Sequence, residues 1–232
     1  MRIFYNVFKK ELNLLFKGTG FIWLSFVFSV GLFTLFRFTL PAHNMNIETA
    51  ISILWGAYVI SCLFSLLAAQ EWEWEWFAYR AVRLSGTAGH TVFLSKSIAT
   101  FVALSLLWIF ILTVWFVFFG GSFLPADASI PVILIKYFSK FLVVGILATL
   151  GITFLGQLAA VLALHSRFRH ILLLILFFPM SLPVLIAGSS FCRLAWQEAE
   201  WSEMSGLLNL LAAFLFIYAA AGIALYDYLW EE

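Results

Sequence analysis

The sequence predicts an all-α membrane protein with six transmembrane helices, because six long stretches contain no Asp, Glu, Lys, Arg or His. A helix of about 20 apolar residues spans the hydrocarbon, where only a self-bonded backbone tolerates the absence of water. Hydrophobic residues make up 64% of the chain and charged residues 11%, far from the balance of globular domains. The stretches lie between Lys17 and Arg37, Glu48 and Glu71, Lys96 and Asp127, Lys140 and His165, His170 and Arg193, and Glu203 and Asp227.

The six spans and their short connections use nearly all of the 232 residues, which predicts a single transmembrane domain over 1–232. The first stretch is too long and too rich in Phe and Trp for the apolar core of a secretory signal, so we expect it to remain as a span.

The distribution of Lys and Arg predicts that both the N-terminus and the C-terminus are cytoplasmic. Short loops rich in these residues stay on the inner side of the membrane. With the N-terminus inside, nine of the 13 Lys and Arg residues fall in inner segments and four in outer segments. The outer four are Arg37, Lys136, Lys140 and Arg193.

Residues 1–17 lead into the first span, and 2–17 predict an amphipathic helix that lies on the inner membrane surface. One side of this helix is apolar, and Lys9, Lys10, Glu11 and Lys17 form the wet side. The alternative interpretation is a positively charged flank that only fixes the topology.

Residues 70–90 form the longest cytoplasmic connection and contain the run EWEWEW. Strict alternation is typical of a strand, but a lone strand at a membrane face would leave its edge groups unpaired. We therefore expect the second span to continue out of the bilayer as a helix, with Glu71 and Glu75 on one face at i,i+4 spacing. Arg80 and Arg83 follow on a second short helix. The tryptophans can form an aromatic belt and the charges a solvated face; a docking surface for a partner is the functional alternative.

The fourth and fifth spans contain the residues expected in the interior of the bundle. Gly156 begins a pattern of small residues that allows close helix packing, and Gln157 is expected to make an interhelical hydrogen bond or, alternatively, to contact a substrate. Pro179 and Pro183 remove backbone donors near the centre of the fifth span, so this helix should be kinked or locally unwound. The bend is either static or a hinge. The acidic segment after Arg193 predicts a separate interfacial helix on the outer face.

The chain has no G-x-x-x-x-G-K-[ST] phosphate loop and no hydrolase motif, so it is not expected to be an enzyme. Its ionisable side chains lie at or outside the span ends, whereas ion-coupled transporters carry such groups within spans. If the protein moves a solute, the energy is expected to come from another subunit. Neither metal nor nucleic-acid binding is expected.

The stretch LGITFLGQLAAVLALHSRFRHILLLILFFPMSLPVLIAG, residues 150–188, joins a Gly-rich span, a short basic turn and a span with prolines four residues apart. With the six spans, the amphipathic lead and the large inner loop, the chain resembles CcmB, the membrane subunit of the ABC-type haem exporter of bacterial cytochrome c maturation. A weaker likeness covers the inner loop, where Leu94 and Lys96 match the family's leucine and lysine before the third span. The EWEWEW run departs from the family pattern.

The resemblance implies an ABC-2-type permease-like bundle in the bacterial cytoplasmic (inner) membrane. The implied partners are a CcmA-like ATPase subunit, CcmC-like and CcmD-like membrane subunits, a CcmE-like haem chaperone, lipid and a second copy of the chain. ATP would be hydrolysed by the partner and haem handled by the complex, with no cofactor bound directly by this chain. Glu71, Glu75, Arg80 and Arg83 are then the expected ATPase-coupling residues.

Two alternatives belong to other functional classes. One is an ABC-2-type exporter permease for a lipid, glycan or drug, and the other is a non-transporting membrane scaffold. A permease should change the rate of a partner's ATP hydrolysis, whereas a scaffold should have no effect on it.

Overall fold

The structure, a computed structural model, describes residues 7–13, 21–40, 45–75, 88–120, 123, 134–163 and 166–231. Within these ranges the chain is helical and has no strand. The long helices are α2 (Phe21–Thr39), α3 (Ile47–Glu75), α5 (Gly89–Trp115), α8 (Ser139–Ala163), α9 (Arg169–Trp196) and α10 (Trp201–Glu231). The expected all-α membrane bundle is therefore confirmed.

Five of these helices are long and apolar enough to cross a bilayer, and a shorter apolar helix covers Trp23–Thr39 within α2. At 1.5 Å per residue, its 17 residues extend about 26 Å, slightly less than the roughly 30 Å of hydrocarbon. The count of six spans therefore stays a prediction for its first member.

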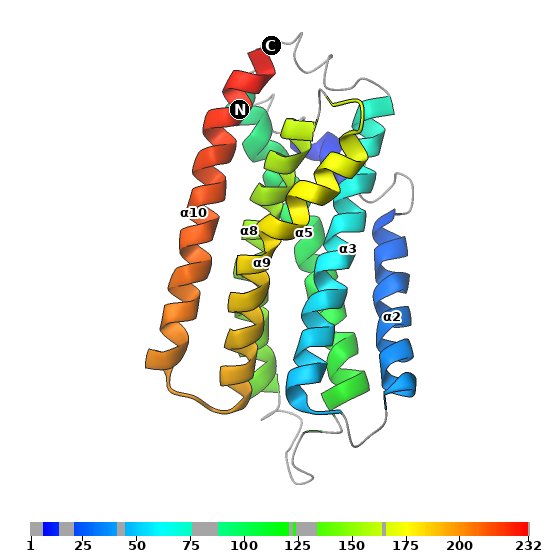
Figure 1. Cartoon of the computed structure of the whole chain (residues 1–232), viewed down its shortest axis with the longest axis vertical. Coiled ribbons are helices and arrows are strands. Elements are labelled where there is room, and N and C mark those ends of the chain that lie inside the picture. The colour runs from blue at the N-terminus through cyan, green and yellow to red at the C-terminus, as the bar shows by residue number, and fades with distance from the viewer. Residues whose placement is uncertain are drawn as a thin grey trace.

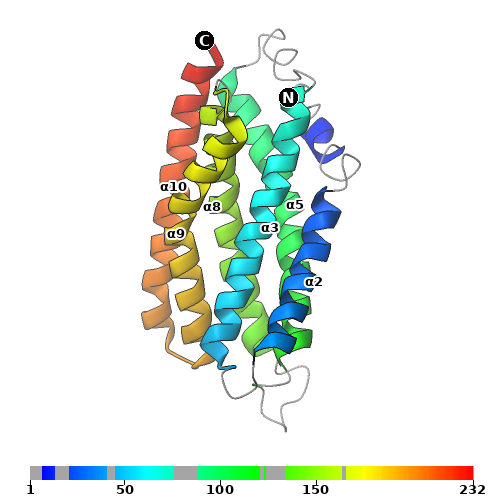
Figure 2. The same cartoon turned by 45° about the vertical axis from the view of Figure 1, so that its right-hand side comes forward.

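The helices run along the long axis of the bundle (Figures 1 and 2). Helix α8 packs against α5, α9 and α10, while α2 packs on α3 and α5. The N- and C-terminal parts lie at the same end of the bundle as the end of α3 and the start of α5 (Figure 1). We name this the terminal end. The start of α3 and the end of α9 lie at the opposite end.

Helix α5 continues as the π-helix η2 (Phe116–Gly120), and the π-helix η3 (Leu134–Phe138) leads into α8. The continuous helical segment Gly89–Gly120 has 32 residues, about 48 Å, and is longer than the hydrocarbon is thick. Its ends therefore extend into the interfacial regions. These π-helical turns have no counterpart in the expectations from the sequence.

The core at the centre of the bundle is aromatic. Trp55 and Tyr58 of α3 and Trp108 of α5 are each at most 1% exposed. The ring centroid of Trp108 lies 5.2 Å from that of Trp55 and 4.7 Å from that of Tyr58. The Tyr58 hydroxyl lies 2.6 Å from the Thr149 hydroxyl of α8, so this polar group has a partner inside the apolar core.

The N-terminal lead contains a helix over residues 7–13, the part of 1–17 that the structure describes. Val7 and Glu11 are both buried, at 7% and 5% exposure. The expectation that Glu11 lies on the wet side of this helix is wrong. Glu11 is one turn beyond Val7, so both share the buried face, and Lys10 forms an ion pair with the carboxylate at 3.2 Å.

Candidate functional site

The end of α3 carries residues 70–75, the first six residues of the expected coupling loop. Helix α3 runs to Glu75, so the EWEWE segment is helical, as its i,i+4 spacing predicts. Glu71 and Glu75 lie one turn apart in the last turns of this helix. Their side chains, and the whole of Arg80 and Arg83, lie outside the described residues. Their proposed role in docking an ATPase stays a prediction.

A chain of buried side-chain amides and a hydroxyl lies directly beneath this segment. The Gln70 amide of α3 donates to Gln157 Oε1 of α8 at 3.4 Å, and the Gln157 amide donates to the Thr100 hydroxyl of α5 at 3.0 Å. All three residues are at most 5% exposed. Because Gln70 precedes Glu71, this chain fixes the base of the loop to two neighbouring helices. Gln157 thus makes interhelical contacts, whereas sequence reasoning did not single out Gln70 or Thr100.

Gly156 lies beside Gln157, where α8 meets α3. A Cβ added at Gly156 would lie 2.6 Å from Leu66 Cδ1, closer than side chains tolerate. The absence of a side chain therefore permits the approach of α8 to α3, the use of small residues that membrane helices favour. Helix α3 is also hydrogen-bonded to α2, because the Ser65 hydroxyl of α3 lies 2.9 Å from the Ser25 hydroxyl of α2.

Helix α9 contains both Pro179 and Pro183 and is α-helical throughout Arg169–Trp196. Figure 1 shows that its N-terminal half leans relative to its C-terminal half. The expected bend is present, and local unwinding is not observed. Tyr218 of α10 donates to the Met180 carbonyl at 2.6 Å, which attaches α10 to the middle of this bent segment.

Two buried tryptophans each pack onto a glycine of a neighbouring helix. A Cβ at Gly188 of α9 would overlap the Trp55 indole, and a Cβ at Gly145 of α8 would overlap the Trp108 indole. Gly188 follows Pro183 by five residues, so Trp55 joins α3 to the C-terminal half of the bent helix. The sequence carried no signal for these contacts, because helix propensity and spacing do not specify which indole meets which glycine.

Lys96 lies in the second turn of α5 and is 4% exposed. Its Cα is about 10 Å from the start of the helix at Gly89. This agrees with a place near the span end, because the segment Gly89–Gly120 is longer than the hydrocarbon. Its burial in protein was not expected from the sequence.

The segment between the fifth and sixth spans differs from the expected interfacial helix. Helix α9 runs to Trp196 and α10 begins at Trp201, so only a short turn separates them. In this turn Glu198 has a φ of 61° and accepts hydrogen bonds from Lys136 Nζ at 2.6 Å and from the Tyr137 hydroxyl at 2.9 Å. These donors hold the pKa of the Glu198 carboxyl below its ordinary value. The long apolar helices leave too few residues for another helix.

A model of the protein family described as CcmB protein matches residues 2–225. The chain belongs to the CcmB family. This match covers the N-terminal lead, the inner loop and the Pro-x-x-x-Pro helix, and it confirms the resemblance seen in the sequence. A search of curated protein sequences gave no match.

Membership of the CcmB family assigns the chain to the membrane subunits of ABC-type haem exporters in cytochrome c maturation. A CcmB subunit is a membrane permease and is not itself an enzyme. The apolar helices agree with an integral, multi-pass membrane protein. In this CcmB protein, α3 extends as a helix at the terminal end of the bundle. Gln70, Gln157 and Thr100 form a polar anchor beneath this extension. The bent helix α9 contacts α3 where Gly188 meets Trp55.

Proposed function

We propose that this chain is the permease subunit that couples ATP hydrolysis by a separate CcmA-like ATPase to haem delivery or release of the haem chaperone. The family match carries this proposal, since it covers nearly the whole chain. The complex lies in the bacterial inner membrane with both termini in the cytoplasm. This orientation places nine of the 13 Lys and Arg residues on the inner side of the membrane, where such residues are in excess in membrane proteins.

The ATPase contacts the loop over residues 70–90, with Glu71, Glu75, Arg80 and Arg83 as docking residues. The length of α3 supports this assignment, because its 29 residues extend about 44 Å and exceed the hydrocarbon thickness by about two turns. The hydrogen bonds from Gln70 to Gln157 and onward to Thr100 give the loop a firm base. A displacement of the loop therefore acts on α3, α5 and α8 together.

The movement passes along α3 to α9. Trp55 packs on Gly188, so a shift of α3 along its axis pushes the C-terminal half of the bent helix. The bend around Pro179 and Pro183 lets the two halves of α9 respond differently. In this mechanism the prolines act as a hinge, and Gly156 and Gln157 keep α8 in register with α3.

The remaining components of the complex follow from the family. CcmC-like and CcmD-like membrane subunits and a CcmE-like haem chaperone are proposed partners, together with lipid and a second copy of the chain. ATP is bound and hydrolysed by the partner, since the chain has no phosphate-loop sequence. Haem is handled by the complex, and no cofactor is bound directly by this subunit.

Charge reversal in the loop tests the proposal. The double variant Arg80→Glu with Arg83→Glu should insert into the membrane normally but no longer co-purify with its ATPase in mild detergent. The matched control reverses Arg167 and Arg169, which lie in the other inner connection. Normal co-purification of the first variant would show that these arginines do not dock the ATPase.

A further inference from the structure

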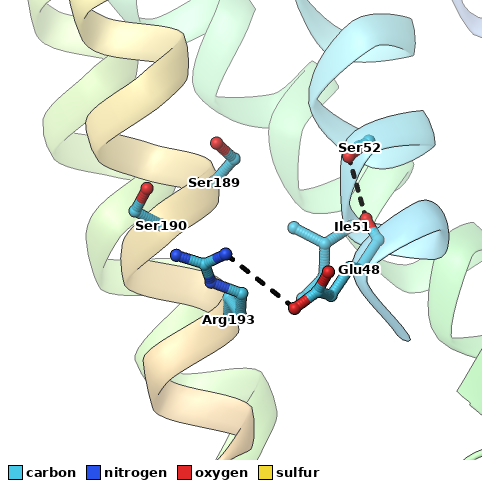
Figure 3. Close-up of a pocket in the computed structure, with 6 residues that line it drawn as sticks. All are labelled: Glu48, Ile51, Ser52, Ser189, Ser190 and Arg193. Carbon is cyan, nitrogen blue, oxygen red and sulfur yellow. Dashed lines mark hydrogen bonds and ion pairs between the residues drawn. The ribbon is translucent and has the colours of Figure 1, made fainter. Parts of the chain in front are cut away.

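A small polar pocket lies between the first turns of α3 and the last turns of α9, at the opposite end of the bundle from the chain termini (Figures 1 and 3). Its volume is about 150 Å³. It is lined by Glu48, Ile51, Ser52, Ser189, Ser190 and Arg193. The proposed haem-export mechanism does not use this pocket.

The pocket presents one positive and one negative group from different helices. Arg193 Nη1 of α9 lies 3.8 Å from Glu48 Oε1 of α3, and the two side chains are 47% and 56% exposed. A charge-assisted hydrogen bond is shorter, about 2.7 to 2.9 Å, so this pair is loosely held. The guanidinium has five N–H donors in a fork suited to phosphate, and the carboxylate can accept from an ammonium. The Ser52 hydroxyl donates to the Glu48 carbonyl at 2.8 Å, which leaves its oxygen lone pairs as additional acceptors.

A stripe of exposed apolar side chains on α9 leads to this pocket. Its members repeat at helical spacing, are 43% to 61% exposed and belong to a candidate membrane span. They are Ile171, Ile175, Phe178, Leu182 and Ile186. Ser189, Ser190 and Arg193 follow Ile186 by three, four and seven residues and continue the same face. The polar pocket thus begins where the apolar stripe ends.

The aromatic residues at this end of the bundle indicate the depth of the membrane surface. Trp201 is 61% exposed at the start of α10, and Tyr137 lies 4.6 Å from Trp196, centroid to centroid. Such residues gather at headgroup level in membrane proteins. A ligand in the pocket therefore lies among lipid headgroups, with the apolar stripe extending into the hydrocarbon beneath it.

We propose that this pocket binds the headgroup of a zwitterionic aminophospholipid such as phosphatidylethanolamine. The phosphate contacts Arg193, the ammonium contacts Glu48, and an acyl chain lies along the α9 stripe. An anionic headgroup without an ammonium brings its phosphate toward the Glu48 carboxylate with no compensating charge, so it binds less well. The pocket distinguishes the two lipids by the partner that each offers to Glu48.

Native mass spectrometry of the purified full-length chain in mild detergent tests this proposal, with phosphatidylethanolamine and phosphatidylglycerol added at equal concentration. The wild type should retain phosphatidylethanolamine preferentially. Arg193→Gln should weaken its retention about tenfold, as for loss of a charge-assisted contact. Glu48→Gln should reverse the preference toward phosphatidylglycerol, because the pocket then carries a net positive charge. Arg37→Gln, a change of the other arginine expected on this face, is the control and should leave both lipids bound as in the wild type.

Equal retention of the two lipids by the wild type would overturn the proposal. So would an equal loss in Arg193→Gln and Arg37→Gln, which would indicate general surface electrostatics. The reversed preference of Glu48→Gln provides a gain of binding that misfolding cannot produce. Bound lipid is measured directly, so the result does not depend on the proposed coupling to an ATPase.

Discussion

Replacing Gln157 with leucine tests whether the polar anchor holds the base of the inner loop. Leucine has a similar size and is fully apolar, so Gln157→Leu keeps most of the packing and removes both side-chain hydrogen bonds. The Gln70 amide and the Thr100 hydroxyl each lose the contact that Gln157 provides. We expect lower stability and weaker stimulation of the partner ATPase in the same variant, because the anchor lies directly beneath the docking segment.

The expected loss of stability follows from the two bonds. Side-chain hydrogen bonds between membrane helices contribute about 0.6 kcal/mol each, so two contribute about 1.2 kcal/mol. Incomplete pairing of the buried groups left behind adds to this figure, which gives about 1 to 2 kcal/mol. That loss raises the unfolding equilibrium constant roughly 5- to 30-fold.

Unfolding in mixed micelles with increasing SDS, followed by tryptophan fluorescence, measures this change. A double-mutant cycle with Thr100→Val should give a coupling energy of about 0.6 kcal/mol. Thr113→Val is the control, because Thr113 is exposed and its hydroxyl donates to the Ile109 carbonyl of its own helix at 2.7 Å. It should change stability by less than about 0.5 kcal/mol.

Two results would be incompatible with a polar anchor at Gln157. Gln157→Leu would unfold at the same SDS fraction as the wild type, or the cycle with Thr100→Val would show no coupling. Either outcome means that the amide contacts do not hold α3, α5 and α8 together.

Three further changes probe packing, charge and the bend. Gly145→Ala should cost about 1 to 3 kcal/mol, because the new methyl group overlaps buried Trp108, whereas Gly206→Ala has open space and should gain up to about 1 kcal/mol of helix propensity. The lowered pKa of Glu198 means that its ionised form stabilises the fold above the ordinary carboxyl pKa of 4.5, and this contribution is lost as pH falls through the folded-state value. The stability difference between the wild type and Glu198→Gln should accordingly be full at neutral pH and shrink in acid. Pro183→Ala should straighten α9, as measured by the distance between spin labels at its two ends, without loss of stability.

Each of these expectations has a contrary result. Equal effects of the two glycine changes would mean that the Trp108 contact is not tight. A pH-independent difference for Glu198→Gln would remove the charge from the explanation. An unchanged label distance in Pro183→Ala would show that packing, and not the proline, bends the helix.

The sequence was sufficient for features that depend on residue type and local spacing. The charge-free stretches predicted the membrane helices, and the i,i+4 spacing of Glu71 and Glu75 correctly favoured a helix over a strand. The prolines of α9 predicted its bend because a missing N–H and a ring clash act within one turn. These effects are local, so the residues alone determine them.

Other features depend on how the helices rotate against one another, which spacing does not specify. Gln157 was expected to bond across helices, but its partners Gln70 and Thr100 lie 87 and 57 residues away in the chain. The pairing of Glu48 with Arg193 likewise requires the register of α3 against α9. The burial of Glu11 was missed because a short amphipathic helix can turn either side toward a bundle. In each case tertiary packing decides the outcome.

The rate of ATP hydrolysis by the CcmA-like subunit, reconstituted in vesicles with and without this chain, tests the coupling role most directly. If the chain is the coupling subunit, its presence changes this rate, and the variant Arg80→Glu with Arg83→Glu abolishes the change. A rate that is the same with and without the chain would exclude this coupling role, as would solute flux driven by an ion gradient through the chain alone.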